Sequence, residues 1–293
     1  MFGLLNIHKP TGMTSRDVVN RVQRWIRPHK VGHAGTLDPL AEGVLVLGVG
    51  PATRLVPYVQ RLAKTYVGTF ELGQCSDTED VEGEVKRIED ARQPTADEIA
   101  DQVPRFVGEI MQQPPAYSAL KVQGRRAYEL ARAGEAPELA ARPVMIHQLR
   151  VLRYAYPSLQ LEIVCGSGTY IRSLGRDLAI ALGTQAVMSA LCRTQVGPFT
   201  LERAVRLDDL NPQNLETSLL PASLAVAELP KIEVNAAERQ ALSEGRTLPS
   251  PVEVFADTSE WAAIDAAGGL VAVLRPAASG GLRPYRNFAN LPD

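Results

Sequence analysis

Apolar residues along the chain follow two spacings, and each spacing predicts a different kind of element. The unbroken run at 44–49 has the length and composition of a buried strand. Residues 64–73 alternate instead, so the side chains of Tyr66, Phe70 and Leu72 are expected on one face of a half-buried strand. Further strands are predicted at 4–7, 142–146 and 159–165.

Helical spacing appears at two places. After Thr14 and Ser15, either of which can cap a helix, apolar residues recur every three or four positions until Pro28 ends the run. The opposite face of this predicted helix carries Arg16, Arg21, Arg24 and Arg27. The same spacing at 171–182, closed by Gly183, predicts a second helix buried on one side.

A glycine-rich loop at 31–43 leads into the buried strand and carries one carboxylate in its middle. Pro39 disfavours helical backbone at Asp38, so that side chain is expected to project from an extended loop. Rigid scaffolds commonly present catalytic groups in this way. An ordinary turn, in which Asp38 bonds its own backbone, accounts for the same residues.

The composition is ordinary for a globular protein, and its 293 residues suit one large domain and a small one. The net charge of −2 hides a basic first part, which suits phosphate binding or a solvated helix surface, and an acidic stretch near 74–101. No apolar stretch is long enough to span a membrane, and no secretory signal is visible. The three cysteines form no CxxC pair, so we expect a cytoplasmic protein without a disulfide framework.

Two polar segments are predicted to leave the core. The acidic stretch 77–83 lacks the ligand spacing of a calcium loop, so we interpret it as a solvated hairpin tip. The double proline at 114–115 excludes a helix or central strand and opens a loop that contains Lys121 with arginines and tyrosines. This mixture suits contacts with phosphates and bases, and it equally suits a polar surface excursion.

Separated stretches of the chain share their residues and their order with one protein family. They are KPTGMTS at 9–15, GHAGTLDPLAEGVL at 32–45, KTY at 64–66, PAYSALK at 115–121, GTYIR at 168–172 and LCRT at 191–194. Over roughly residues 3–230 the chain resembles the TruB-type tRNA pseudouridine synthases. In the last stretch it departs from the usual LRRT, because Cys192 replaces an arginine and puts a local phosphate contact in question.

The resemblance implies an isomerase that converts the T-loop uridine of tRNA, position 55 in standard tRNA numbering, to pseudouridine. The base is flipped out, the glycosidic bond is cleaved and the base is reattached through C5. Asp38 is then the catalytic aspartate, Arg172 pairs with it and holds it ionised, and Tyr66 stacks under the uracil. Contacts with substrate or RNA are implied for His33, Lys9, Lys121, Tyr170 and Leu191.

The same resemblance sets expectations for fold and partners. It implies an α+β catalytic domain over 1–230, with a mixed, largely antiparallel sheet flanked by helices, the pseudouridine synthase fold. An RNA-gripping insertion lies at about 113–142, and a small, mainly β, PUA-like domain covers 231–293. The expected partner is the T stem-loop of tRNA, bound by a monomer. Because the reaction involves no redox or phosphoryl-transfer step, we expect no cofactor, and the four histidines show no metal-ligand spacing.

Two other functions are compatible with parts of the sequence. A non-catalytic RNA-binding protein on the same scaffold would not need Asp38, Tyr66 and Arg172 together. A glycoside hydrolase would need a second carboxylate near Asp38, and Glu42 is the candidate in the sequence.

Overall fold

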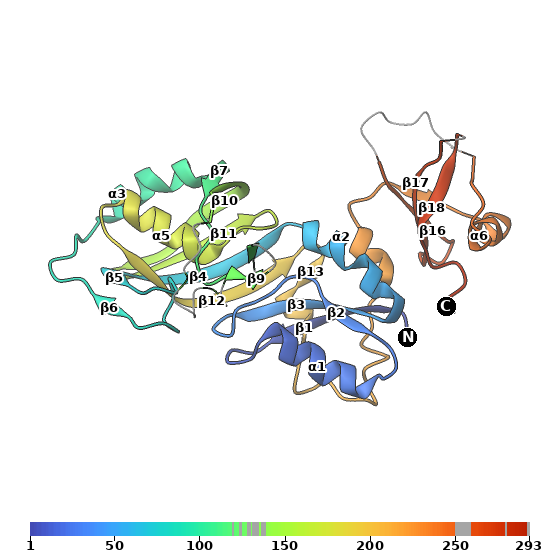
Figure 1. Cartoon of the computed structure of the whole chain (residues 1–293), viewed down its shortest axis with the longest axis horizontal. Coiled ribbons are helices and arrows are strands. Elements are labelled where there is room, and N and C mark those ends of the chain that lie inside the picture. The colour runs from blue at the N-terminus through green and yellow to red at the C-terminus, as the bar shows by residue number, and fades with distance from the viewer. Residues whose placement is uncertain are drawn as a thin grey trace.

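The computed structural model describes residues 1–118, 120–122, 125–127, 130, 135, 139–249, 259–278 and 280–291, and one large mixed sheet forms its centre (Figure 1). The strand order is β14-β1-β3-β12-β4-β11-β10-β7, with β2 beside β3 and β13 beside β12. The bounds are β1 Gly3–Lys9, β2 Val31–His33, β3 Glu42–Val49, β4 Lys64–Leu72, β7 Gly108–Gln112, β10 Arg142–Ala155, β11 Ser158–Cys165, β12 Ala186–Val196, β13 Phe199–Thr200 and β14 Val205–Arg206. In this sheet the described pairs β1–β14 and β3–β12 are parallel and the others are antiparallel, which confirms the predicted α+β class.

Helices cover two different parts of the sheet (Figure 1). Helix α1 (Ser15–Trp25) buries its valines against β1 and β3. Helices α3 (Ala96–Gln102) and α5 (Ile171–Ala181) pack with the inward side chains of β4 and β11. The shorter helical turns are η1 Gly50–Leu55, α2 Val56–Arg61, η2 Val103–Phe106, η3 Leu201–Arg203 and η4 Ala222–Val226.

The first predicted helix forms as its sequence indicates. The Thr14 hydroxyl accepts a hydrogen bond from the Asp17 amide at 3.1 Å, and the Asp17 carboxylate accepts one from the Thr14 amide at 3.0 Å. This capping box satisfies two donors at the helix start. The second predicted helix also forms, and Gly183 follows it with a φ of +72°, a conformation that glycine adopts without strain.

The register of β12 brings distant parts of the chain together. Arg193 lies opposite Gly43 of β3 on one side and opposite Tyr66 of β4 on the other. Gly43 ends the glycine-rich loop, with a φ of +105°. A Cβ atom there would lie 2.3 Å from the Arg193 carbonyl oxygen, so only glycine allows this close approach of β3 to β12.

The acidic stretch 77–83 is the hairpin connection that the sequence predicted, but only part of it is solvated. It connects β5 (Gln74–Cys75) and β6 (Lys86–Arg87), and it folds back onto the body of the protein. The Met188 amide donates to the Glu79 carbonyl at 3.0 Å, and Asp80 is only 2% exposed. The prediction of a solvated tip was wrong for Asp80 and Glu79, because Arg172 and Arg176 of α5 pair with them and shield them from water.

A second sheet follows near the C-terminal end of the chain. Its order is β15 (Lys231–Glu233), β16 (Trp261–Ile264), β17 (Leu270–Pro276) and β18 (Leu282–Asn287), and helix α6 (Ala236–Ser243) packs on it. The remaining two-stranded piece, β8 (Lys121–Val122) with β9 (Arg125–Arg126), lies within the segment between β7 and β10. None of the described helices is both long and apolar enough to cross a bilayer.

Candidate active site

The loop that carries Asp38 is held from both sides. The Ser15 hydroxyl accepts a hydrogen bond from the Leu37 amide at 2.8 Å and donates one to the Leu37 carbonyl at 3.2 Å. The Gly12 amide donates to the Pro39 carbonyl at 2.8 Å. Leu37 is buried in the core, whereas the Asp38 side chain keeps 35% of its surface exposed. The loop therefore presents one fixed carboxylate to solvent.

Arg172 of α5 is the partner of this carboxylate. Its Nε atom lies 3.1 Å from Oδ2 of Asp38, and its side chain is only 8% exposed. The same guanidinium donates to the Thr78 carbonyl at 2.7 Å and to the Tyr117 carbonyl at 3.0 Å. The ion pair expected from the sequence is thus present, and it belongs to a wider network.

Asp80 is the member of this network that sequence reasoning missed. Its Oδ2 atom lies 3.3 Å from Nη1 of Arg172, while Oδ1 accepts hydrogen bonds from the Thr78 hydroxyl at 2.6 Å and the Glu82 amide at 3.1 Å. Arg172 therefore lies between two carboxylates, one buried and one exposed. A run of acids in a predicted turn carries no mark of which one is buried, so the sequence held no signal that singles out Asp80.

Tyr66 lies in the core beside the loop. Its inward position on β4 leaves it 9% exposed, packed in the same cluster as Leu37 and Leu191. Burial raises the pKa of its phenol, so the ring is a neutral phenol at pH 7. The Arg193 guanidinium lies 6.0 Å from the centre of the ring.

Arg193 is buried although it carries a charge. Its Nε donates to the Val44 carbonyl at 2.7 Å and its Nη2 to the Gly35 carbonyl at 3.2 Å, and the residue is 2% exposed. These bonds join β12 to both ends of the Asp38 loop. They satisfy a charge that would otherwise be costly to bury.

The other predicted contact residues lie at different depths. His33 is half-buried in β2, and burial followed by the charge of Arg16 lowers the pKa of its imidazole. Tyr170 precedes α5, where its amide donates to the Gln112 side chain at 2.8 Å and its ring lies 5.3 Å from the Arg142 guanidinium. Both partners of Tyr170 border the predicted insertion. Lys121 has its backbone in β8, but its side chain lies outside the described part of the structure.

Lys9 departs from the expectation of an RNA contact. It is fully buried, and its ammonium group donates to the carbonyls of Pro10 at 2.8 Å and Met13 at 2.6 Å. Burial lowers its pKa to about 8, and the charge of Asp38 opposes this shift. The structure places Lys9 behind the loop rather than on a surface that RNA can touch.

Comparisons with known proteins give matches to one family over most of the chain. Residues 23–171 match the N-terminal domain of the TruB family pseudouridylate synthases, and residues 172–227 match the C-terminal domain of tRNA pseudouridylate synthase B. The tRNA pseudouridine synthase B of Ruegeria pomeroyi is 41% identical over 98% of this chain and 95% of its own length. The chain belongs to the TruB family.

A second relative and a solved structure support the same family assignment. The tRNA pseudouridine synthase B of Rhodospirillum rubrum is 47% identical over 83% of this chain and 80% of its own length. Among solved structures, a Cbf5-Nop10-Gar1 complex contains a chain that superposes with a TM-score of 0.72 at 27% identity. That match covers 94% of the present chain and 78% of the other, which supports the predicted pseudouridine synthase fold.

Two residues near the site were left open by the sequence: Cys192, which departs from the family motif, and Glu42, the candidate second carboxylate. Cys192 is half-buried in β12, and burial raises the pKa of its thiol to about 11, so it supplies no charge for a phosphate. Glu42 begins β3 and lies 3.4 Å from His8, with 44% of its side chain exposed. Glu42 is thus paired with His8 and is not part of the Asp38–Arg172 ion pair.

Proposed function

We propose that Asp38 is the catalytic group with which this chain isomerises the T-loop uridine of tRNA, position 55, to pseudouridine. As a member of the TruB family the chain is a tRNA pseudouridine synthase, an isomerase. The observation that carries the assignment to Asp38 is its 3.1 Å ion pair with buried Arg172, which leaves the carboxylate partly exposed on a fixed loop.

The reaction places simple demands on this site. The bond from N1 of uracil to the ribose breaks, a bond from C5 to the same carbon forms, and the proton of C5 is replaced by one on N1. The substrate and the product have the same atoms, so one positioned carboxylate is enough to act as nucleophile or base. Arg172 pairs with Asp38 and holds it in place, since it is itself fixed by Asp80 and two backbone carbonyls.

The uracil is held by the neighbouring core residues in this proposal. Tyr66 stacks against the flipped base as a neutral phenol, and Leu191 lines the same pocket. Lys9 supports the loop from behind instead of contacting RNA. A base in a folded loop must first be extruded, at a cost of a few kcal/mol, and His33 contacts the flipped nucleotide or its vacated stack.

The proposal also assigns the remaining parts. Residues 1–230 form the catalytic domain, its insertion at about 113–142 grips the T stem-loop, and residues 231–293 form a PUA-like RNA-binding domain. A monomer is sufficient because Asp38, Arg172 and Tyr66 come from one chain. Cytoplasmic location is supported by the three cysteines, all of which are free thiols.

The decisive experiment compares wild type with Asp38→Asn on an unmodified tRNA transcript. Carbodiimide labelling followed by primer extension is expected to give a stop at the T-loop uridine with wild type and no stop with the variant. Gel shift is expected to show that both proteins bind the transcript.

Glu42→Gln serves as the matched control, because it removes a nearby carboxylate that is not part of the Arg172 network. It should retain the stop. Turnover by Asp38→Asn would refute the assignment of the catalytic group, and loss of turnover by Glu42→Gln would favour a site with two carboxylates.

A further inference from the structure

A row of cations follows the exposed face of α1 and the turn after it, outside the candidate active site. Arg16 and Arg24 are exposed on the helix, and Arg27 and Lys30 are exposed in the turn. At about 100° per residue, the two helical arginines fall within an arc of roughly 80°, away from the buried valines. None of the four cations forms an ion pair with another residue that the structure describes. We call them the α1 cation row.

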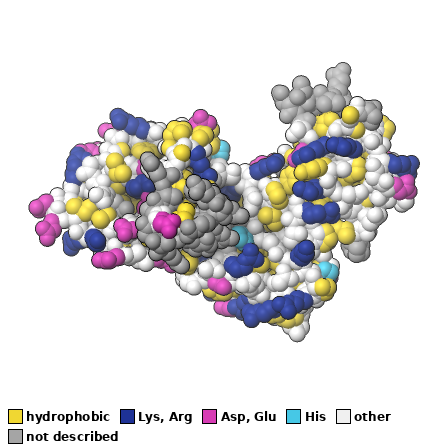
Figure 2. All heavy atoms as spheres, viewed as in Figure 1, with side chains coloured by type: hydrophobic (Ala, Val, Ile, Leu, Met, Phe, Trp, Pro, Cys, Tyr) yellow, Lys and Arg dark blue, Asp and Glu magenta, His cyan; other side chains and the backbone are white. Residues whose placement is uncertain are grey.

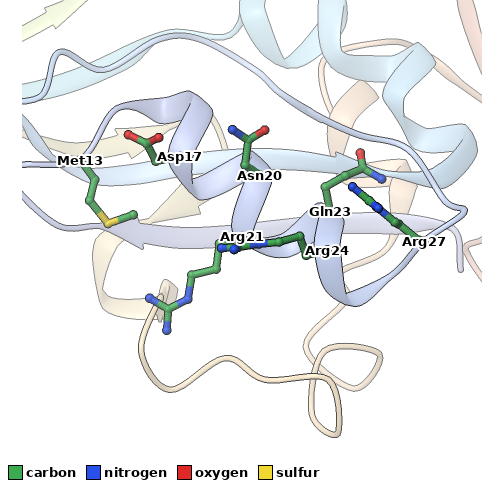
Figure 3. Close-up of a pocket in the computed structure, with 7 residues that line it drawn as sticks. All are labelled: Met13, Asp17, Asn20, Arg21, Gln23, Arg24 and Arg27. Carbon is green, nitrogen blue, oxygen red and sulfur yellow. The ribbon is translucent and has the colours of Figure 1, made fainter.

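The other charges on this helix are already paired. Arg21 lies 2.9 Å from Asp208, and Asp17 is held in the capping box. Figure 3 shows Arg21 reaching toward the neighbouring loop, while Asn20, Gln23, Arg24 and Arg27 follow the helix to its end. These side chains line a hollow of about 670 Å³. The surface beside the row is thus concave, and the one acid in its lining, Asp17, is held by Thr14 in the capping box.

The α1 cation row starts beside the candidate active site. Ser15, the first residue of α1, holds Leu37, the neighbour of Asp38. The next residue, Arg16, is close enough to His33 for its charge to lower the pKa of that imidazole. Eleven residues of helix extend about 16 Å, which corresponds to roughly five steps of 3.4 Å along one nucleic-acid strand.

The row also lies away from the two strands that flank the predicted insertion. Helix α1 covers β1 and β3, whereas the insertion connects β7 and β10 at the far edge of the same sheet. In Figure 2, Lys and Arg side chains gather along the edge over α1, and acidic side chains lie toward the other end, around β5 and β6. The basic side chains over α1 are therefore set apart from the acidic end of the molecule.

We propose that the α1 cation row binds the phosphate backbone of the tRNA substrate where it leads away from the flipped uridine. This inference rests on the proposed function, since it takes tRNA as the partner. Phosphates suit the row because exposed arginines and lysines bind them without any base recognition. Asn20, exposed between the cations, adds a hydrogen-bond donor for phosphate or ribose oxygens.

The test is tRNA binding by Arg24→Gln/Arg27→Gln, measured over a series of salt concentrations. We expect the Kd for full-length tRNA to rise roughly tenfold or more. The slope of log Kd against log salt should flatten by roughly 0.7 to 0.9 for each phosphate that the variant no longer neutralises. Arg24→Lys/Arg27→Lys keeps both charges and is expected to retain most of the affinity.

Arg87→Gln/Arg105→Gln is the matched control, because it removes two exposed arginines from the acidic end of the molecule. It should leave both Kd and salt slope unchanged. A T stem-loop hairpin is measured in parallel. Weaker binding of both RNAs places the contact within the stem-loop, and weaker binding of full-length tRNA alone places it outside; either result supports the proposal.

An unchanged Kd and an unchanged salt slope on both RNAs overturn the inference. That failure is distinct from failure of the proposed function, because carbodiimide labelling reports separately whether wild type forms pseudouridine. Far-UV circular dichroism of the variants checks that α1 is still folded.

Discussion

At the scale of single residues, the candidate site depends on how one arginine is shared. Arg172 contacts the exposed Asp38 and the buried Asp80 at similar distances, 3.1 and 3.3 Å. Truncating one partner of a buried charge leaves the other charge without compensation, which costs more than the pair contributes. Asp80 therefore matters for the position of Arg172, although it is itself buried.

We expect Asp80→Asn to lower kcat roughly ten- to hundredfold, since a hydrogen bond to a charged group contributes about 1.5–3 kcal/mol. The amide can still accept from Thr78 and Glu82, but it turns an NH2 group toward Arg172. Single-turnover kinetics with saturating tRNA measures the effect on the chemical step.

Glu79→Gln is the comparison, because it alters the adjacent acid, which pairs with Arg176 instead. It should change kcat less than Asp80→Asn does. Equal losses from both variants, accompanied by equal losses in Tm, would mean that the turn contributes stability alone.

At the scale of elements, α5 must lie close to β4 for Arg172 to reach the loop. Gly175 permits this approach, because a Cβ atom there would lie 2.1 Å from Cε1 of Phe70. Phe70 is 1% exposed and points from β4 toward the helix. The sequence predicted both elements correctly, but neither spacing nor propensity indicates that a glycine inside a helix is a packing contact.

Gly175→Ala is expected to destabilise the protein by roughly 1–2 kcal/mol. Overpacking costs about 1–3 kcal/mol, and the better helix propensity of alanine returns up to about 1 kcal/mol. Denaturant unfolding measures the change. In the double variant Gly175→Ala/Phe70→Leu the loss of unfolding free energy should be smaller than the sum of the two single losses. Strict additivity would show that the added methyl group does not clash with the Phe70 ring.

At the scale of the whole molecule, the C-terminal sheet shares a core with the large sheet. Phe288 stacks on Phe2 with 5.0 Å between ring centres, and the Arg54 guanidinium lies 4.4 Å from the Phe288 ring. Buried Glu260 adds polar contacts, 2.6 Å to Arg275 of its own sheet and 3.9 Å to Arg61 of α2. The C-terminal sheet is thus held by both apolar and charged contacts.

Phe288→Ala is expected to weaken this attachment by about 3–5 kcal/mol, as is usual for a buried phenylalanine. Calorimetry should then resolve an early transition for the C-terminal sheet, followed by the main one. Arg283→Ala, on the same sheet and exposed, should leave the profile nearly unchanged. An unaltered single transition for Phe288→Ala would mean that the two sheets unfold together without this contact.

The sequence by itself determined the local elements and singled out Asp38 as the candidate carboxylate. Local patterns act over a few residues, so they can be recognised before the fold is known. Examples are the apolar run before Val49, the alternation around Tyr66 and the capping box at Thr14. Motif order indicated the family, and the comparisons confirmed it.

Only the tertiary structure decided which distant groups meet. Burial of Asp80, burial of Lys9 and the close packing of Gly43 on Arg193 depend on strand register and on how a helix lies over a sheet. Such contacts join residues far apart in the chain, and a charge or a glycine has the same appearance in the sequence whether it faces water or another strand. Long-range packing therefore places an acidic turn, which the sequence suggests is solvated, against Arg172 of the candidate active site.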